Sequence, residues 1–392
     1  MPEKHNLRSI NTGVVGCGFI GRIHVEALRR LGYVNVLALA SRSQEIADAK
    51  AAELSIPKAY GNWFDLVEDE DIEVVHISTT NELHYPVARA CIEAGKHVIC
   101  EKPLALTAKE AKELLRIADK RGIVHAVCHS LRYYPLVKQA RAMVQAGEVG
   151  TVRLIHGHYL QDWLFLETDY NWRLISELSG KSRAVADIGT HWLDMVQHVT
   201  EQRIISVCAD MTTFIPVRKK PIQEVETYSQ QQLKHTEYED VKVDTEDHAT
   251  VMLRFSEGAK GVLMVSQVCA GRKNYIHFEI NGSRSSLGWN GENANLLWIG
   301  ERGKVNGEFI KNPAIMDPYA ARYAGAPCGL EEGYLDTFKY IFSDVYEWIR
   351  EEEQMDTDAA SFPTFKTGYE LLCIVEAIFR SSGSGTWEEV RL

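Results

Sequence analysis

The stretch TGVVGCGFIGRIHVEALRRLG, residues 12–32, decides the fold of the first part of this chain. It runs from a short apolar segment through a glycine-rich turn into the apolar spacing that is typical of a helix. The turn is G-x-G-x-x-G, with its glycines at Gly16, Gly18 and Gly21. Between a strand and a helix this pattern predicts a dinucleotide-binding loop, whose helix offers free N–H groups to phosphates. A glycine-rich turn without a ligand is the alternative.

Outward from this loop, strands and helices alternate as far as about residue 130. The apolar segment 72–79 predicts a strand, and 107–122 predicts a helix that is opened by a capping box of Thr107 and Glu110. Strands separated by helices of about 10–15 residues form βαβ units and a parallel sheet. We therefore predict an α/β Rossmann domain with a mostly parallel sheet over residues 1–131.

After residue 150 the pattern changes, because strand-like segments follow one another with few helices between them. This predicts an α+β C-terminal domain over residues 132–392, with a mainly antiparallel open sheet. We expect an early helix near 188–199 and late helices at about 331–352 and 364–380. The long polar segment 218–247 is interpreted as a surface insertion or a partner-facing loop. The expected strands are 152–160, 205–214, 247–255, 260–268 and 274–282.

Composition and charge narrow the class of protein. The 392 residues carry a net charge of −11 without a dense basic cluster, so nucleic acid is not an expected partner. No apolar run reaches the roughly 18 residues that span a bilayer, and the polar N-terminus does not resemble a signal peptide. We expect a cytoplasmic protein. Its eight cysteines show no zinc-site spacing, which predicts buried reduced thiols and no metal.

The end of the second predicted strand bears on the choice of cofactor. An acidic residue about 20 residues after the glycine loop would bind a ribose 2′-hydroxyl and favour NAD. This chain has Ser41 and Arg42 there instead. An arginine can pair with a 2′-phosphate, so the cofactor is predicted to be NAD(P), with NADP favoured over NAD. An exposed loop arginine with no ligand is the alternative.

Three further residues are candidates for catalysis. Lys102, in ICEKPLALT (99–107), follows a predicted strand at the sheet edge that carries the glycine loop, and Pro103 would hold it extended or in a cis bond. Asp187 and His191, in VADIGTHWLDMVQHV (185–199), are four residues apart and share a face if helical. A neutral histidine suits loss of a hydroxyl proton, and a cationic lysine stabilises the developing negative charge. Asp187 can hold the substrate or orient the imidazole. A surface lysine and solvent-facing polar residues are the alternatives.

With the glycine loop, EKP and D-x-x-x-H in this order, the sequence resembles the glucose-fructose oxidoreductase/inositol dehydrogenase/rhizopine-catabolism (Gfo/Idh/MocA) family over nearly its whole length, with a subgroup similarity to glycoside 3-dehydrogenases. The segments STTNELHYPVARACIEAGKHVICEKPLALT and ADIGTHWLDM carry the resemblance. It implies that Lys102, Asp187 and His191 are the catalytic and substrate-binding residues. It also implies a cofactor site made of Gly16, Gly18, Phe19, Ile20, Gly21, Ser41, Arg42, Thr79, Thr80, Asn81, His84, Glu101, Lys102, Trp172 and Arg173.

The resemblance implies an oxidoreductase that moves a hydride between nicotinamide and a secondary hydroxyl or ketone of a sugar, glycoside or cyclitol. It also implies that the C-terminal domain serves substrate binding and oligomerisation, that its late helices pack back on the first domain, and that the protein is a homodimer or homotetramer. Two alternatives stay open. One is a redox-assisted glycoside lyase or hydrolase with recycled NAD, because a transient ketone acidifies the neighbouring C–H. The other is a non-catalytic regulator that senses a nucleotide. Ordinary packing and a surface ion pair are equally good explanations of Trp172 and Arg173.

Overall fold

The computed structural model describes residues 8–222, 237–351 and 355–392. The chain forms two compact units. The first combines residues 1–130 with 335–370, and the second combines 131–334 with 371–392. The late segment 335–370 therefore belongs with the N-terminal residues, and the second unit is not continuous in sequence.

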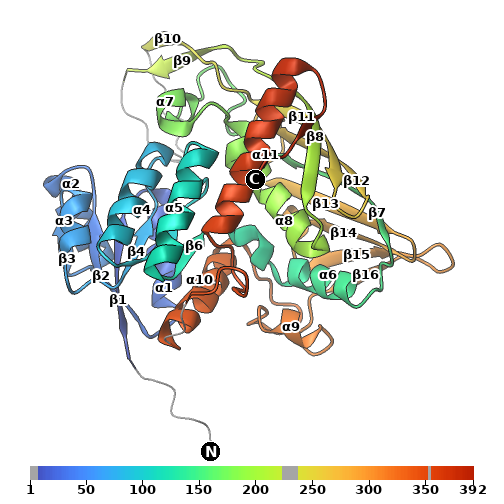
Figure 1. Ribbon diagram of the computed structural model, residues 1–392, viewed down its shortest axis with the longest axis horizontal. Coiled ribbons are helices and arrows are strands. Elements are labelled where there is room, and N and C mark those ends of the chain that lie inside the picture. Colours follow the sequence, from blue (N-terminus) through green and yellow to red (C-terminus); the bar gives the residue numbers. More distant parts are fainter. Residues whose placement is uncertain (1–7, 223–236, 352–354) are drawn as a thin grey trace, which may run out of the picture. The chain divides into compact units, whose positions relative to one another are not determined.

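The first unit is built on a parallel sheet, seen on the blue side of Figure 1. In the part of the chain that the structure describes, its strand order is β3-β2-β1-β4-β5-β6, and every neighbouring pair is parallel. This order is that of a doubly wound dinucleotide-binding fold, as the alternating pattern predicted. The strands are β1 (Ile10–Val15), β2 (Val34–Ala40), β3 (Lys58–Tyr60), β4 (Val74–Ile77), β5 (His97–Cys100) and β6 (His125–Val127).

Local sequence signals set the helices of this unit. The helix α5 starts at the predicted capping box, where Thr107 accepts from the backbone N–H of Glu110 and Glu110 reaches back to Thr107. It ends at Gly122, whose φ of 66° suits a left-handed C-cap. The helices are α1 (Phe19–Arg29), α2 (Gln44–Leu54), α3 (Trp63–Glu68), α4 (His84–Glu93), α5 (Ala108–Arg121) and α10 (Tyr334–Arg350), with a 3₁₀ turn, η1, at Asn81–Leu83.

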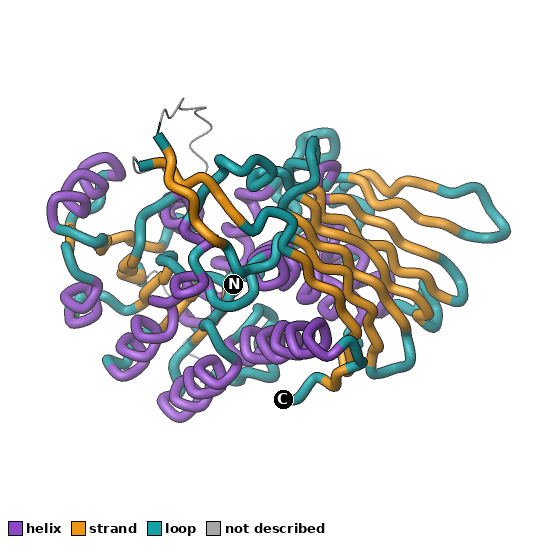
Figure 2. Tube along the Cα trace, turned by 90° about the horizontal axis from the view of Figure 1, so that it is seen from above, coloured by secondary structure: helices purple, strands orange, loops and turns teal. Residues whose placement is uncertain are grey.

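The second unit contains a large mixed sheet, whose strands run side by side in Figure 2. Among the described residues it has nine strands in the order β16-β15-β14-β13-β7-β12-β11-β8-β17. Only the pair β12 and β7 is parallel, so the predicted antiparallel character is confirmed. The strands are β7 (Val152–Leu160), β8 (Ile204–Thr212), β11 (His248–Phe255), β12 (Lys260–Ser266), β13 (Tyr275–Gly282), β14 (Ser286–Asn290), β15 (Leu296–Gly300), β16 (Gly307–Ile310) and β17 (Glu388–Glu389).

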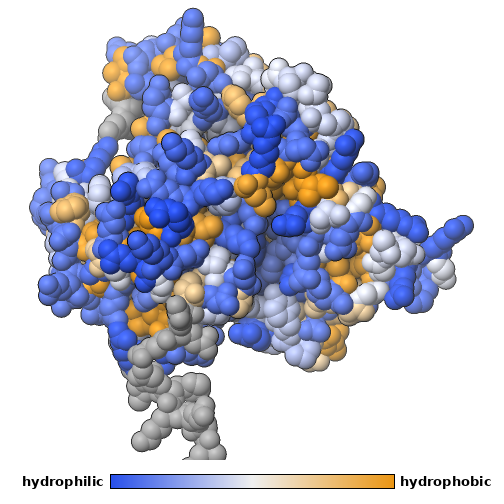
Figure 3. Space-filling view, in the orientation of Figure 1, coloured by the Kyte–Doolittle hydropathy of each residue, from blue (hydrophilic) through white to orange (hydrophobic). Residues whose placement is uncertain are grey.

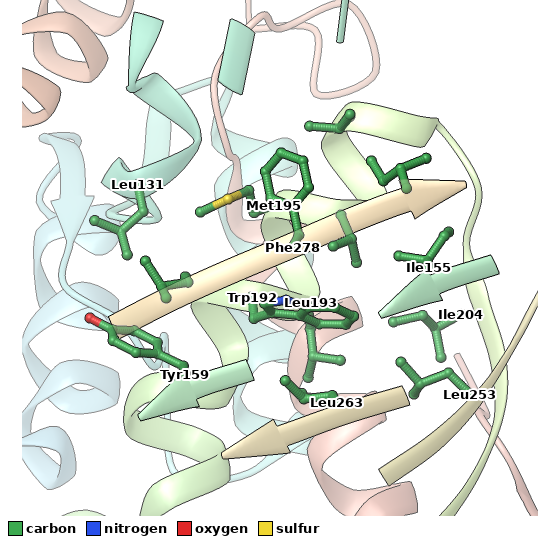
Figure 4. Packing of buried hydrophobic residues seen from close by; sticks show 14 of the residues in the cluster. Leu131, Ile155, Tyr159, Trp192, Leu193, Met195, Ile204, Leu253, Leu263 and Phe278 are labelled. Atoms are coloured by element: carbon green, nitrogen blue, oxygen red, sulfur yellow. The ribbon is translucent and has the colours of Figure 1, made fainter. Parts of the chain in front are cut away.

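The core of this unit lies between the sheet and helix α8 (Thr190–Thr200), as Figure 4 shows. The indole of Trp192 donates from Nε1 to the backbone carbonyl of His277 at 2.8 Å. It crosses β7 at Gly157, where an added Cβ would lie 2.6 Å from Trp192 Nε1, so only glycine fits. The predicted apolar stripe is buried, at Ile188 in the turn before α8 and at Trp192, Met195 and Val199 of α8. The other helices are α6 (Pro135–Gln145), α7 (Ser176–Ser179), α9 (Pro318–Ala321) and α11 (Phe365–Ser384), with 3₁₀ turns η2 (Ser130–Tyr133), η3 (Trp172–Leu174) and η5 (Gly291–Asn293).

The interpretation of 218–247 as a surface insertion is wrong at both ends. Residues Val217–Pro221 form β9 and Tyr238–Lys242 form β10, which pair antiparallel. Arg218 and Asp247 are fully buried, and both form hydrogen bonds with neighbouring segments. The middle of the segment, 223–236, lies outside the described residues.

Surface hydropathy and cysteine burial bear on two further expectations from the sequence. Figure 3 shows a predominantly hydrophilic face interrupted by separate hydrophobic patches. Among the residues that the structure describes, no helix is both long and apolar enough to cross a membrane. Five cysteines are buried, but Cys208 and Cys269 are half-buried and Cys328 is exposed, so the expectation of burial is wrong for these three.

Candidate functional site

The glycine loop of the first unit has the geometry that its sequence predicts. Gly16 has a φ of 86°, and an added Cβ would lie 2.8 Å from the carbonyl oxygen of Ser78. A Cβ on Gly21 would lie 2.2 Å from the carbonyl oxygen of Gly16, so this glycine lets α1 pack against the loop. A Cβ on Gly18 would meet nothing within 4 Å. Contacts within the protein do not require glycine there, whereas the approach of a ligand to the backbone does.

The start of α1 is open to an anion. Gly18 is its N-cap and offers no side-chain hydrogen bond to the first turn, in which there is no acidic residue. The free N–H groups and the helix dipole there favour a phosphate. Phe19, the first helical residue, is 48% exposed, and Ile20 is half-buried. The residues present therefore fit a dinucleotide pyrophosphate.

The ends of β2 and β4 supply the next candidates. Ser41 follows β2 and donates its backbone N–H to Tyr60, and the neighbouring Arg42 is exposed. After β4, the Thr79 hydroxyl donates to the carbonyl of Thr80 at 3.0 Å. The Thr80 hydroxyl donates to Glu82 at 2.7 Å. Asn81 begins the short turn η1.

His84 connects two of these loops. It is 1% exposed, and its Nδ1 lies 2.7 Å from the carbonyl oxygen of Pro103, while Nε2 lies 3.3 Å from the carbonyl oxygen of Thr79. Burial lowers the pKa of His84, although the two carbonyl oxygens oppose this. This residue therefore fixes the loop after β5 against the loop after β4.

The EKP segment follows β5 directly. The bond between Lys102 and Pro103 is cis, one of the two geometries expected from the sequence. Glu101 is 7% exposed and accepts a hydrogen bond from the backbone N–H of Lys102 at 3.3 Å. Since β1, β2, β4 and β5 are parallel, the residues that follow them lie at one edge of the sheet. Glycine loop, Arg42, Thr79 and Lys102 therefore share the edge where doubly wound sheets bind ligands.

In the second unit, Asp187 and His191 lie at the entrance to α8. Residues Val185–Gly189 form a π-helical turn, η4, and α8 begins only at Thr190. The predicted helix 188–199 is therefore wrong at its start, because the backbone N–H of Thr190 reaches back to Val185. Asp187 precedes the α-helical turn that contains His191, which is 8% exposed. π-turns are frequent at functional sites.

Asp187 is held by two donors. Gln267 donates from Nε2 to Oδ2 of Asp187 at 2.9 Å, and Arg173 donates from Nε to Oδ1 at 3.3 Å. The guanidinium carbon of Arg173 also lies 4.4 Å from the ring centre of Trp172, a cation–π distance. The structure thus brings together Asp187 and Arg173, two residues that the sequence proposed for different roles.

Sequence reasoning missed the buried layer behind Asp187. Arg183 is 1% exposed and donates from Nη1 to Oε1 of Gln267 at 2.9 Å and from Nε to the hydroxyl of Thr245 at 3.1 Å. Burial lowers its pKa to about 10, although Asp247 and Glu246 oppose this. Glu246 accepts hydrogen bonds from the backbone N–H groups of Arg183 and Val185, which anchors the π-turn. Thr245, Glu246 and Asp247 are consecutive polar residues, and their clustering was the only signal available.

One further cluster has no sequence signature. Among the described residues, donor atoms of His24, Glu101 and Cys128 lie within 4.8 Å of one another, and all three residues are buried. The sequence predicted no metal-ligand cluster, because these residues are far apart along the chain and follow no ligand spacing.

Both parts of the chain are similar to proteins of one oxidoreductase family. Residues 10–129 match the family described as an oxidoreductase family with an NAD-binding Rossmann fold, and residues 137–288 match the GFO/IDH/MocA C-terminal domain. Levoglucosan dehydrogenase of Pseudarthrobacter phenanthrenivorans is 30% identical over 98% of this chain and 99% of its own. Inositol 2-dehydrogenase of Salmonella paratyphi B is 35% identical over 38% of this chain and 46% of its own.

Solved structures agree with the sequence comparison. A levoglucosan dehydrogenase in complex with NADH and L-sorbose superposes with a TM-score of 0.87 at 29% identity and covers 98% of this chain and 99% of its own. An inositol dehydrogenase homologue in complex with NAD+ from Azotobacter vinelandii has a TM-score of 0.85 at 26% identity, covering 97% of both chains.

Proposed function

The chain belongs to the Gfo/Idh/MocA oxidoreductase family, and from this premise we propose that it is an NAD(P)-dependent dehydrogenase. It transfers a hydride between the nicotinamide and a secondary hydroxyl or ketone of a sugar, glycoside or cyclitol. The single observation that carries the proposal is the shared sheet edge of the first unit, where the glycine loop follows β1 and Lys102 follows β5, with only β4 between these two strands. Relatives that act on levoglucosan and inositol support the substrate class.

Lys102, His191 and Asp187 have distinct parts in the proposed reaction. Bound NAD(P) supplies the acceptor for the hydride. His191 takes the proton of the substrate hydroxyl, because a neutral imidazole is a suitable base near neutral pH. Lys102 stabilises the negative charge that develops on that oxygen. Lys102 belongs to the first unit and His191 to the second, so their joint action on one hydroxyl is part of the proposal.

Asp187 is assigned an orienting part rather than a proton-accepting one. A carboxylate that accepts hydrogen bonds from Gln267 and from the Arg173 guanidinium is suited to its ionised form. In that form it can accept from a substrate hydroxyl or hold the His191 imidazole. Arg173 and Trp172 complete this side of the proposed site, where the stacked guanidinium and indole form a flat surface for the cofactor or the sugar.

The preference between NAD and NADP is a second part of the proposal. Arg42, exposed after β2, would pair with a 2′-phosphate, and residues 41–43 are Ser-Arg-Ser without a carboxylate to repel one. This favours NADP, whereas two relatives in the comparison were crystallised with NADH or NAD+. Binding measurements with both cofactors decide between them.

The experiment that tests the function is a screen for cofactor reduction. Levoglucosan, inositols, free sugars and glycosides are each incubated with NAD and with NADP, and absorbance at the reduced-nicotinamide band is followed. Reduction by at least one carbohydrate is expected. Release of an aglycone without accumulating reduced cofactor would favour the lyase or hydrolase alternative. Cofactor binding without turnover of any substrate would favour a regulator.

We also propose a homodimer or homotetramer formed through the outward face of the nine-stranded sheet. On β11 and β12, Met252, Val262 and Met264 are 38–46% exposed and adjacent, since Met252 pairs with Val262 across the ladder. Leu154 on β7 extends this apolar surface. Val262→Asp should lower the molar mass measured by light scattering, and an unchanged mass would exclude this face. Cytoplasmic residence also remains a proposal, which cell fractionation tests.

A further inference from the structure

A line of buried polar side chains runs through the first unit to Glu101. We call Thr12, Tyr346, His76, His24 and Glu101 the buried chain. Each of the first four is fully buried, and Glu101 is 7% exposed. The buried chain joins α10, β1, β4 and α1 to the EKP segment. A polar network this deep is costly unless every member is satisfied.

The contacts are continuous. The hydroxyl of Thr12 lies 2.7 Å from that of Tyr346, and the latter lies 3.0 Å from Nε2 of His76. The Nδ1 atoms of His76 and His24 are 2.9 Å apart. The chain ends where Nε2 of His24 lies 3.1 Å from Oε1 of Glu101.

With both imidazoles neutral, the protons in the buried chain can point in only one of two directions. A neutral imidazole has one N–H, so a proton placed on one nitrogen leaves the other as an acceptor. If Glu101 is ionised, it accepts from His24 Nε2, and His24 Nδ1 accepts from His76. The phenol of Tyr346 then donates to His76 and accepts from Thr12. Protonating Glu101 would require all these donors to reverse.

The surroundings favour the ionised arrangement. Burial raises the pKa of Glu101, but His24, Lys102 and His84 more than offset this, and the resulting pKa lies below the usual value. Burial and the neighbouring His24 keep the pKa of His76 well below its usual value, so this ring is neutral. Burial raises the pKa of Tyr346, which therefore remains a phenol.

The other groups around His24 and Glu101 do not place a second negative charge next to Glu101. The Cys128 sulfur lies 4.0 Å from Nε2 of His24, and burial together with Glu101 raises the pKa of that thiol, as it does for Cys100. The backbone N–H of Lys102 donates to the second carboxylate oxygen of Glu101. On the far side His24 is packed against the rings of Phe338 and Phe342, which carry no charge.

We propose that the buried chain holds a permanent negative charge at Glu101, next to Lys102, and that this charge makes the protein bind oxidised nicotinamide cofactor more tightly than reduced cofactor. The inference rests on the proposed cofactor site at this sheet edge. The oxidised ring is cationic and the reduced ring is neutral, so a fixed carboxylate distinguishes them by a Coulomb term. The direction of the hydrogen bonds in the buried chain keeps Glu101 ionised when the pH falls moderately.

The test compares the dissociation constants of NAD+ and NADH in the full-length protein by calorimetry at several pH values. In wild type the NADH-to-NAD+ ratio of dissociation constants should be constant between about pH 6 and 9. Glu101→Gln, which still accepts from His24, should lower this ratio by about tenfold, equivalent to about 1.4 kcal/mol. Tyr346→Phe removes the donor to His76 and should make the ratio fall as the pH drops toward 6, since the pKa of Glu101 then rises.

Two matched variants control for indirect effects. Tyr340→Phe removes a hydroxyl from the same helix outside the buried chain, and Glu113→Gln removes a carboxylate of α5 that accepts from Tyr85. Both should leave the ratio unchanged within about twofold, which lies below the Coulomb term of a nearby charge. Circular dichroism establishes that each variant is folded.

The outcomes separate this inference from the proposed function. Failure of wild type to bind either cofactor would contradict the function itself. Binding of both cofactors with an unaltered ratio in Glu101→Gln would overturn only the role of the charge. Elemental analysis adds a second check, because one tightly held metal ion per chain at His24, Glu101 and Cys128 would replace the hydrogen bond and overturn the assigned proton positions.

Discussion

Gln267 holds Asp187 with an amide whose orientation is already decided. Its Oε1 accepts from the buried Arg183 at 2.9 Å, so its NH₂ group must face Asp187, to which it donates at 2.9 Å. Arg183 is itself fixed by Thr245 and by an ion pair with Asp247 at 3.8 Å. A buried cation thus sets, through one amide, the hydrogen bonding of a candidate catalytic carboxylate.

Gln267→Met is expected to lower kcat/KM by about 10- to 100-fold, because a hydrogen bond to a charged group contributes about 1.5–3 kcal/mol. Steady-state kinetics measures this, and the dissociation constant of the cofactor should stay within about twofold, since the hydrogen bonds of Gln267 go to Asp187 and Arg183 and not to the glycine loop. Gln267→Glu keeps the acceptor for Arg183 but places a second carboxylate beside Asp187. The decrease in kcat/KM in this variant should therefore become larger as the pH rises. Wild-type kcat/KM in both variants would show that Asp187 does not depend on this contact.

Lys102→Met and His191→Ala are each expected to abolish turnover, with losses of at least about 1,000-fold. In the proposed mechanism Lys102 stabilises the negative charge on the substrate oxygen and His191 takes the hydroxyl proton. Cofactor binding should remain near normal in both variants. Lys109→Met, at an exposed position on α5, is the matched control and should retain wild-type activity. The assigned roles fail if both variants stay folded but no longer bind cofactor.

Arg42→Ala is expected to weaken NADPH binding by about tenfold and NADH binding by less than about twofold, because only the former carries a 2′-phosphate. Fluorescence titration of the reduced cofactors measures both constants. Arg116→Ala, at another exposed arginine of the same unit, controls for the loss of general positive charge. Equal weakening of the two cofactors would show that Arg42 does not recognise the phosphate.

His97 makes the free energy of unfolding depend on pH. Its Nδ1 accepts from the backbone N–H of Val124 at 2.9 Å, and burial lowers its pKa to about 4. The folded state therefore disfavours the charged ring. The stabilisation that the neutral His97 ring contributes is complete above about pH 6.5 and is lost as the pH falls toward 4. The loss amounts to about 3 kcal/mol for a shift of this size.

His97→Asn, which keeps an acceptor but does not titrate, should flatten this dependence. Urea unfolding between about pH 7 and 4.5 measures the change, with the window set by the two pKa values. His156→Asn, where the side chain is 38% exposed, is the control and should retain the wild-type slope. An unchanged slope in His97→Asn would assign the acid sensitivity to other groups.

Most of the local structure could be predicted because its signals are local. The glycine spacing of the first loop, the capping box at Thr107 and the stripe from Ile188 to Val199 all depend on residues within a few turns of one another. The π-turn at Asp187 could not be predicted, since Glu246 anchors it from about 60 residues away. The late strands β14, β15 and β16 were also missed, because each has only four or five residues.

By itself, the sequence determined that a strand, a glycine loop and a helix begin this chain and that Lys102 follows a buried strand. Only the tertiary structure decided that Tyr346 contacts Thr12 and His76, residues 334 and 270 positions away. Periodicity and capping act over a few residues, whereas a buried polar atom must find a partner wherever the fold supplies one. The partners of Glu101 and Asp187 were therefore decided by packing.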